Sequence, residues 1–178
     1  DGHVSYDPPA DAPPVGPLPA GVDAPLTFAS FHRPNKINQP LAQLWARILR
    51  DEPGSRILFT YAGYEIPEVQ TRISRWFSAE GIAGDRLVFE GAVSHSELLA
   101  RYNQADIALD SSPYSGGLTT LEALWMGVPV VTLPGQSFAG RHSLSHLSVV
   151  GCTETIAASE DDYVAIAVRL AQDKAFRD

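Results

Sequence analysis

Positive charge is scarce in this sequence. The 178 residues carry 13 Lys and Arg against 21 Asp and Glu, which gives a formal net charge of −8 and a pI near 5.0. A nucleic-acid groove holds its phosphate backbone with clustered Lys and Arg, so this composition argues against that class of protein and we expect no nucleic-acid partner. A local basic site for one small phosphate group is compatible with the same charge balance.

Cysteine and long apolar runs are scarce as well. Cys152 is the only cysteine, which excludes an internal disulfide and a cysteine-based metal cluster, and we expect it to be a buried, unreactive thiol rather than a reactive one. No apolar run approaches the ~20 residues that a membrane span requires. We therefore expect no membrane span and a soluble, cytoplasmic protein.

Three widespread motifs are also missing. The GxGxxG dinucleotide fingerprint and the Walker P-loop do not occur, which disfavours NAD and ATP, and the GxSxG elbow of many serine hydrolases is absent too. His142 and His146 have the i,i+4 spacing of a zinc site, but "HSLSH" lacks the Glu of HExxH. A capping or core role is favoured for both, and we expect no metal site.

The first 25 residues differ from the rest of the chain. Residues 1–25 hold seven of the 14 prolines, which forbids regular helix, and we interpret them as a linker or a strap. Residues 26–178 alternate amphipathic helical patterns with short β-branched or aromatic runs. The runs that predict buried strands are "LTFASF" (26–31), "RILFTY" (56–61), "RLVFEG" (86–91), "DIALD" (106–110) and "VPVVTL" (128–133). This alternation predicts one α/β domain with a Rossmann-like, doubly wound parallel sheet.

The stretch "DIALDSSPYSGGLTTLEALWMGVPVVTL" (106–133) contains the strongest candidate site. Gly116 and Gly117 follow a predicted strand and precede a helix that should begin near Leu118 or Thr119. Parallel sheets bind ligands at the carboxyl ends of their strands, and a helix start with the Thr119 and Thr120 hydroxyls suits a phosphate. A tight turn followed by a threonine cap explains the same residues, and spacing alone does not decide between the two.

Two charged residues are expected at the same edge of the sheet. Glu122 follows Thr119 by three residues and is placed to accept hydrogen bonds from ribose hydroxyls, although an acid that complements the helix dipole is the simpler interpretation. Lys36 in "FHRPNKIN" follows the first predicted strand and is placed to neutralise a diphosphate, although a solvated lysine is the simpler interpretation. The shared crevice favours the ligand-binding interpretation for both.

Two blocks of sequence resemble one known family. "TFASFHRPNKINQPLAQLWARIL" and "ALDSSPYSGGLTTLEALWMGVPVVTLPGQSFAGRHSLSHLSVVG" are similar to glycosyltransferase family 41, the O-GlcNAc transferase family, in its bacterial form. The resemblance runs from about Tyr6 to the end of the chain. It implies the C-terminal, donor-binding half of a GT-B fold, with UDP-N-acetylglucosamine as donor. It also implies an N-terminal catalytic half and tetratricopeptide repeats upstream, with the proline-rich stretch as the connection between the halves.

The resemblance also assigns roles to individual residues. Lys36 would bind the diphosphate and act as the catalytic residue, with Arg33 near the uridine, and Glu122 would hold the ribose hydroxyls. The remaining donor-binding residues would be Val93, His95 and Arg101 around the uracil end and Gly116, Gly117, Leu118, Thr119 and Thr120 at the helix start.

The implied reaction moves N-acetylglucosamine from UDP to a Ser or Thr of a protein or peptide acceptor, with inversion. No metal or other cofactor is expected if a lysine and a helix dipole neutralise the diphosphate. The chain offers no convincing general base or acceptor groove, so we expect it to be inactive by itself. Two alternatives stay open, a UDP-sugar-binding module without catalysis and a GT-B-like UDP-sugar epimerase.

Overall fold

A computed structural model describes residues 4–19 and 25–177 of the chain. Its sheet has five strands in the order β3-β2-β1-β4-β5, and every pairing is parallel. The strands are β1 (Thr27–Ser30), β2 (Arg56–Thr60), β3 (Leu87–Glu90), β4 (Ile107–Leu109) and β5 (Val130–Val131). Each lies within a predicted run and is shorter than that run by one to four residues. The predicted doubly wound parallel sheet is confirmed.

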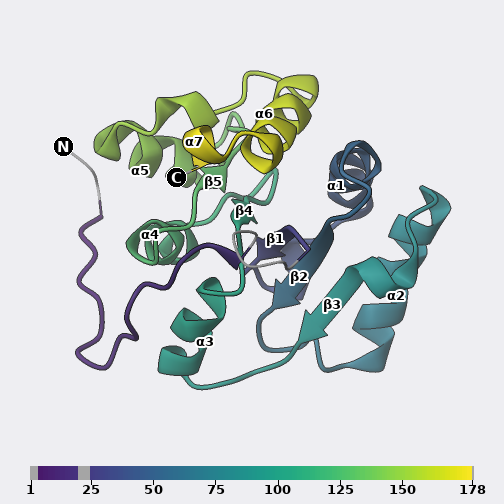
Figure 1. Cartoon of the computed structure of the whole chain (residues 1–178), viewed down its shortest axis with the longest axis horizontal. Helices are drawn as coiled ribbons and strands as arrows, with labels where there is room; N and C mark the ends of the chain where they lie inside the picture. Colours follow the sequence, from purple (N-terminus) through teal and green to yellow (C-terminus); the bar gives the residue numbers. More distant parts are fainter. Residues whose placement is uncertain (1–3, 20–24, 178) are drawn as a thin grey trace.

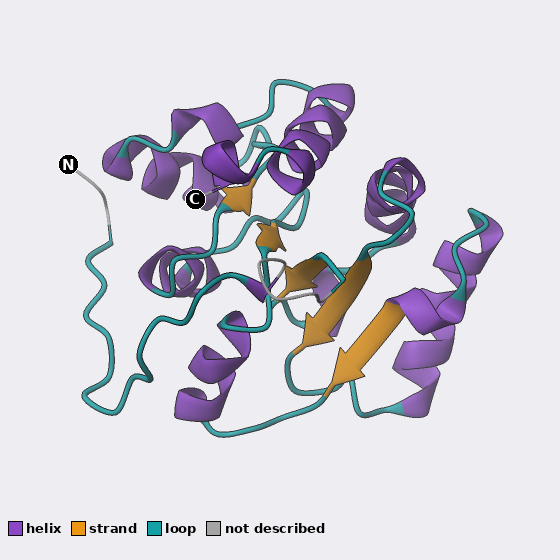
Figure 2. Ribbon diagram, in the orientation of Figure 1, coloured by secondary structure: helices purple, strands orange, loops and turns teal. Residues whose placement is uncertain are grey.

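Helices cover both sides of this sheet (Figure 2). The α-helices are α1 (Gln39–Asp51), α2 (Pro67–Ala79), α3 (His95–Tyr102), α4 (Leu118–Trp125), α5 (His142–Val150), α6 (Glu160–Gln172) and α7 (Lys174–Arg177). Short 3-10 helices are η2 (Pro34–Lys36), η3 (Gly84–Arg86), η4 (Phe138–Gly140) and η5 (Thr153–Thr155). None of the helices in the described part of the chain is long and apolar enough to cross a membrane.

The apolar side chains form two cores, one on each side of the sheet. Alternate residues of one strand point to opposite faces, so Ile57 and Phe59 of β2 join the core under α1, α2 and α6, whereas Leu58 between them joins the core under α3, α4 and α5. β1 and β4 alternate in the same way. A strand buried on both faces reads as a continuous apolar run, which is why the sequence pattern located the strands.

The strand order places a topological switch at the centre of the sheet. The chain proceeds from β1 outward to β2 and β3, and then returns to the other side of β1 to form β4 and β5. The connections after β1 and β4 therefore leave the sheet in opposite directions from neighbouring strands (Figure 1). Ligands of open α/β sheets bind in the crevice at this point, outside the carboxyl ends of the strands.

The proline-rich segment lies against the helices of one face. The Asn103 side chain accepts a hydrogen bond from Gly16 N (2.8 Å) and donates one to Pro14 O (3.1 Å), and Ser96 Oγ donates to Asp11 O (2.9 Å). Figure 1 shows this segment as the purple trace that passes α4 and α3. Residues 1–3 and 20–24 of the predicted linker, and residue 178 of the predicted domain, lie outside the described residues. The domain boundary near residue 25 stays a prediction.

One sequence-based expectation about the fold is wrong. Cys152 is exposed, not buried. It follows Gly151, which ends α5 with a φ of 84°, and so it lies in the surface turn between α5 and η5 instead of on a helix face that packs on the sheet.

Candidate functional site

A cavity of about 720 Å³ opens at the carboxyl ends of β1 and β4. Phe31, His32 and Arg33 enter it directly after β1, and Pro113 and Tyr114 enter it from the loop after β4. Seven of the predicted site residues line it, and they are Arg33, Lys36, His95, Gly117, Leu118, Thr119 and Glu122. The cavity therefore occupies the switch point that the strand order marks.

Lys36 ends the short helix η2 and turns its amine toward the loop after β4. Its Nζ donates to Ser115 O at 2.9 Å and lies 3.8 Å from the centre of the Tyr114 ring. Burial lowers the pKa of the Lys36 amine; Asp110 acts to raise it and the Arg33 charge lowers it further. The lysine is thus a partly desolvated positive charge in the cavity wall, which is an effective way to hold an anion.

The two glycines before α4 have different surroundings. A Cβ on Gly116 would come within 2.5 Å of Thr120 Oγ1, 2.8 Å of Thr119 Oγ1 and 3.0 Å of His32 Cε1, so close packing requires glycine there. A Cβ on Gly117 would meet nothing within 4 Å, and Gly117 lines the cavity. Only Gly117 therefore leaves its backbone open to a ligand.

The helix that follows begins without a side-chain cap. Gly117 is the N-cap of α4, and no side chain caps the helix start there. Thr119 lines the cavity, but the Thr120 side chain is buried and its Oγ1 is bonded to Ser143 Oγ at 2.8 Å. The Thr120 hydroxyl therefore packs against α5 rather than lining the cavity, contrary to the prediction that it faces a phosphate. An uncapped helix start that opens into a cavity is a preformed site for an anion.

Glu122 lies in the cavity wall but is only 2% exposed. Its Oε1 is 2.7 Å from His95 Nε2, and its Oε2 accepts a hydrogen bond from the Tyr102 hydroxyl at 3.2 Å. It is not in the first turn of α4, so the simpler interpretation as an acid on the helix dipole does not describe it. His95, which begins α3 and is half exposed, is the member of this pair that meets solvent.

Besides Thr120, three predicted residues do not line the cavity: Arg101, Val93 and Gly116. Arg101 forms an ion pair with Glu90 (Nε–Oε2 2.8 Å) and donates to Thr60 Oγ1 (2.6 Å), which holds it at the ends of β2 and β3. Val93 is exposed in the loop before α3, and Gly116 is packed inside its turn. The expected contacts of Val93 and Arg101 with a uracil ring stay predictions.

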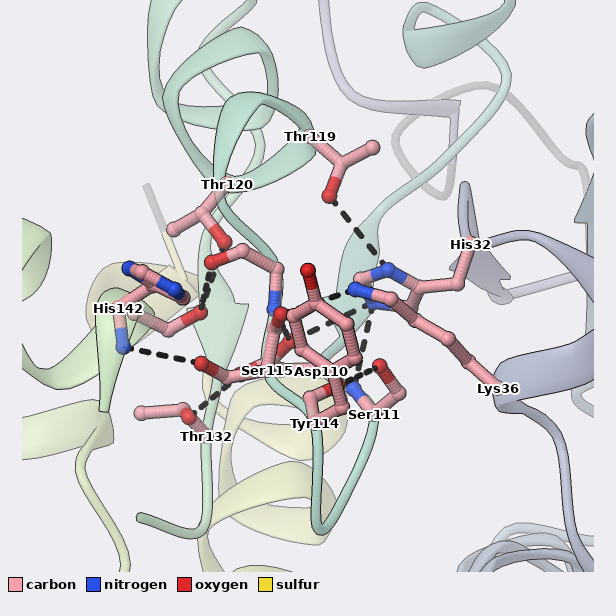
Figure 3. Close-up of polar contacts among 12 residues, drawn as sticks. His32, Lys36, Asp110, Ser111, Tyr114, Ser115, Thr119, Thr120, Thr132 and His142 are labelled. Carbon is pink, nitrogen blue, oxygen red and sulfur yellow. Dashed lines mark hydrogen bonds and ion pairs between the residues drawn. The ribbon is translucent and has the colours of Figure 1, made fainter. Parts of the chain in front are cut away.

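Sequence reasoning missed a buried acid and its histidine. Asp110 is 2% exposed and lies 3.4 Å from His32 Nε2, and its carboxylate also accepts from Gly116 N (2.6 Å) and Thr132 Oγ1 (2.6 Å). Burial acts to raise the pKa of Asp110, but the hydrogen bonds and the charge of His32, together with the hydroxyl donors, outweigh it and lower that pKa. Figure 3 draws Asp110, His32 and Thr132 together with Lys36 and Thr119. The sequence signal that could have identified this pair was a carboxylate, Asp110, directly after a buried strand.

The two histidines considered as a metal pair have different surroundings. His142 begins α5 and lines the cavity, whereas His146 is buried one turn later. Across the residues that the structure describes, no group of three or more His, Cys, Asp or Glu side chains could hold a metal ion.

Comparison with known proteins assigns the chain that forms this cavity to a family. The model of Glycosyl transferase family 41 matches residues 19–178. The chain belongs to glycosyltransferase family 41. A probable UDP-N-acetylglucosamine–peptide N-acetylglucosaminyltransferase SPINDLY of Petunia hybrida is 37% identical to this family 41 chain over 175 residues, which is 97% of the chain and 19% of the relative. A UDP-N-acetylglucosamine–peptide N-acetylglucosaminyltransferase of Caenorhabditis elegans is 32% identical over 154 residues, 85% of the chain and 13% of the relative.

A solved structure agrees with this assignment. A mutant of the O-GlcNAc transferase of Thermobaculum terrenum superposes with a TM-score of 0.90 at 38% identity, over 96% of this family 41 chain and 32% of the solved one. The chain therefore spans about a fifth or less of the curated relatives and about a third of the solved protein.

Proposed function

We propose that this chain is the donor-binding part of a glycosyltransferase that moves N-acetylglucosamine from UDP to a Ser or Thr of a protein or peptide. One observation carries the proposal. The amine of Lys36 and the uncapped start of α4 meet in one cavity at the switch point of the sheet, in a chain that belongs to family 41. Lys36 is the only lysine among the cavity-lining residues named above. That combination suits the diphosphate of a nucleotide sugar.

The chemistry assigned to these groups follows from what leaves in the reaction. When the bond between the sugar and the diphosphate breaks, negative charge grows on the departing phosphate oxygen. Preorganised donors in a partly desolvated site stabilise such charge better than water does. The Lys36 ammonium supplies a full positive charge, and the backbone N–H groups at Leu118 and Thr119 supply the partial charge of the helix start. With these groups we propose that transfer needs no metal ion.

The nucleoside end is assigned to the other side of the cavity. His95 is held by Glu122, and Arg33 Nε donates to the Tyr61 hydroxyl at 3.3 Å, so both cavity residues have fixed partners. We propose that His95, rather than the buried Glu122 carboxylate itself, meets the ribose or uracil. Glu122 then acts by orienting the imidazole.

The rest of the reaction is assigned to parts of the protein that the chain does not include. The petunia and Thermobaculum proteins are several times longer than the match. We propose that an N-terminal catalytic half supplies the acceptor groove and the base, and that tetratricopeptide repeats precede it. Cytoplasmic location and bacterial origin stay predictions of the sequence resemblance.

The test uses the full-length protein with a panel of UDP-sugars and a peptide acceptor. Release of UDP and glycosylation of the peptide are expected with UDP-N-acetylglucosamine. Lys36→Ala should lower turnover by about 10²–10³-fold, the typical cost of one charge-stabilising donor, and should leave the unfolding midpoint near that of wild type. The chain has one other lysine, the exposed Lys174, and Lys174→Ala is the matched control, with unchanged turnover expected.

Other outcomes point to the alternatives. Binding of UDP-sugar without transfer to any acceptor would leave a binding module. Conversion of the UDP-sugar to one in which a single sugar carbon has the opposite configuration would identify an epimerase. Normal turnover in Lys36→Ala at saturating donor would remove the proposed role of the lysine.

A further inference from the structure

His32 and Asp110 form a buried pair that the proposed function has not used. His32 follows β1 and Asp110 follows β4, and these are the two strands on either side of the switch point. The side chains are 6% and 1% exposed, and yet the His32 ring reaches the cavity wall. A carboxylate and an imidazole that are both buried are costly unless their polar atoms are satisfied. The orientation of the ring is therefore informative.

One edge of the ring is held by the protein. Ser111 N donates to Asp110 Oδ1 at 2.9 Å and to His32 Nε2 at 3.2 Å, and Asp110 Oδ1 is 3.4 Å from the same His32 nitrogen. When Nε2 accepts from Ser111 N, the proton of the neutral ring resides on Nδ1. When the ring is charged and Nε2–H points at the Asp110 carboxylate, Nδ1 carries a proton as well. In both of these arrangements Nδ1 is a donor.

The other edge of the ring is only loosely held. Nδ1 is 3.5 Å from Thr119 Oγ1, at the outer limit of a hydrogen bond (Figure 3). Both His32 and Thr119 line the cavity. A stronger acceptor that entered the cavity would therefore replace Thr119 as the hydrogen-bond partner of Nδ1–H at little cost in free energy.

His32 and Lys36 converge on one turn of the chain. Lys36 Nζ donates to Ser115 O, and His32 Cε1 lies 3.0 Å from where a Cβ of the next residue, Gly116, would be. The absent side chain at Gly116 is what lets the ring lie this close to the start of α4. An anion held by Lys36 and by the helix start would thus lie within reach of the His32 ring.

We propose that His32 is a catalytic residue that donates from Nδ1 to the departing diphosphate, with Asp110 and Ser111 holding the opposite edge of the ring. This inference rests on the proposed function. As the acceptor oxygen forms its bond to the sugar, the bond from the sugar to the phosphate oxygen breaks and its electron pair stays on that oxygen. The hydrogen bonds from His32 and Lys36 strengthen as this charge grows, and the proton of the acceptor hydroxyl passes to the base proposed for the N-terminal half.

The position of His32 also rules out the opposite assignment. In an inverting displacement the acceptor attacks from the side of the sugar that faces away from the leaving group. His32 lies with Lys36 and Thr119, on the side of the diphosphate, so it does not take the acceptor proton. A carboxylate behind the ring fits this role because it holds the Nε2 edge, so that Nδ1 faces the cavity.

Two substitutions separate catalysis from packing. In His32→Asn the amide nitrogen takes the place of Nδ1, and in His32→Gln the amide takes the place of Nε2. With the full-length protein, we expect kcat to fall in the order wild type, Asn, Gln, with His32→Gln lowered by about 10²-fold, the typical loss for one such donor. His32→Gln should have a higher unfolding midpoint than His32→Asn, since only Gln keeps the contacts with Asp110 and Ser111.

A binding measurement adds an independent readout. His32→Gln should weaken binding of UDP and leave binding of uridine unchanged, because only UDP carries the diphosphate. A His32→Gln enzyme that is as active as wild type, or more active than His32→Asn, would overturn the inference and leave the ring a structural role. If wild type itself neither binds UDP nor transfers sugar, the proposed function has failed instead.

Discussion

At the scale of single residues, the chemistry proposed for the cavity depends on one lysine in an acidic protein. Lys36 is one of two lysines in a chain with a net charge of −8, and it is partly buried beside Tyr114. Burial lowers its pKa below the ordinary value of 10.5, whereas a bound diphosphate would raise the pKa again. The amine therefore loses its proton more readily without ligand than with it.

This difference predicts a pH dependence of UDP binding. Between the two pKa values, binding takes up a proton, so the affinity of the full-length protein for UDP should fall as pH rises through the pKa of the free amine. Because burial lowers that pKa, the fall should begin below 10.5. Calorimetric titration across the alkaline range measures it.

The matched control for this measurement is Lys36→Arg. A guanidinium keeps its charge throughout the range, while the uracil ring of UDP loses its own proton identically with both proteins. The variant should therefore lack the part of the alkaline fall that belongs to the lysine. Superimposable profiles for wild type and Lys36→Arg would mean that Lys36 does not bind the diphosphate.

At the scale of elements, the start of α4 tests how far the sequence goes. The pattern predicted that both glycines make room for a ligand, but Gly116 makes room for Thr119, Thr120 and His32. Substitution of each glycine by alanine should distinguish the packing role of Gly116 from the ligand-facing role of Gly117. Gly116→Ala overpacks the turn and should cost about 1–3 kcal/mol in the free energy of unfolding. Gly117→Ala places its methyl group in open space, so it should cost much less stability and instead weaken UDP binding.

Urea unfolding and calorimetry on the same two variants check this pair of outcomes. The structural reason for the first is that Thr120 Oγ1 is itself bonded to Ser143, so it has little freedom to give way. If Gly117→Ala proved the more destabilising variant and bound UDP normally, the cavity would not extend to the backbone before α4.

The elements themselves were predictable, and the pairings of polar side chains were not. Strands buried on both faces are continuous apolar runs, so the places of β1 to β5 and the edge with the site could be inferred from local pattern. The contact of His32 with Asp110 joins residues that only the pairing of β1 with β4 brings together. Glu122 was placed at the cavity correctly, but its burial under His95 depends on how α3 packs on α4, which sequence spacing does not encode.

At the scale of the whole molecule, a segment without regular structure contacts α3 and α4, the helices that carry His95 and Glu122. The described part of the proline-rich segment runs along α3 and α4, where Tyr6 packs edge-on against Trp125 at 6.3 Å between ring centres. Prolines lower the entropy that such a segment loses when it becomes ordered. Asn103, directly after α3, anchors it through both atoms of its amide group.

Asn103→Ala should therefore release this segment without unfolding the sheet. Loss of the two hydrogen bonds, which are partly exposed, should lower the free energy of unfolding by about 1 kcal/mol and speed hydrogen exchange at the Gly16 amide. Gln104→Ala changes the exposed neighbour of Asn103 and is the matched control, with unchanged exchange expected. Because α3 begins with His95, a looser segment should also weaken UDP binding by a smaller factor than direct changes at Lys36.

Unchanged exchange at Gly16 in Asn103→Ala would mean that other contacts hold the segment. Faster exchange with unchanged UDP affinity would mean that the segment affects stability and not binding.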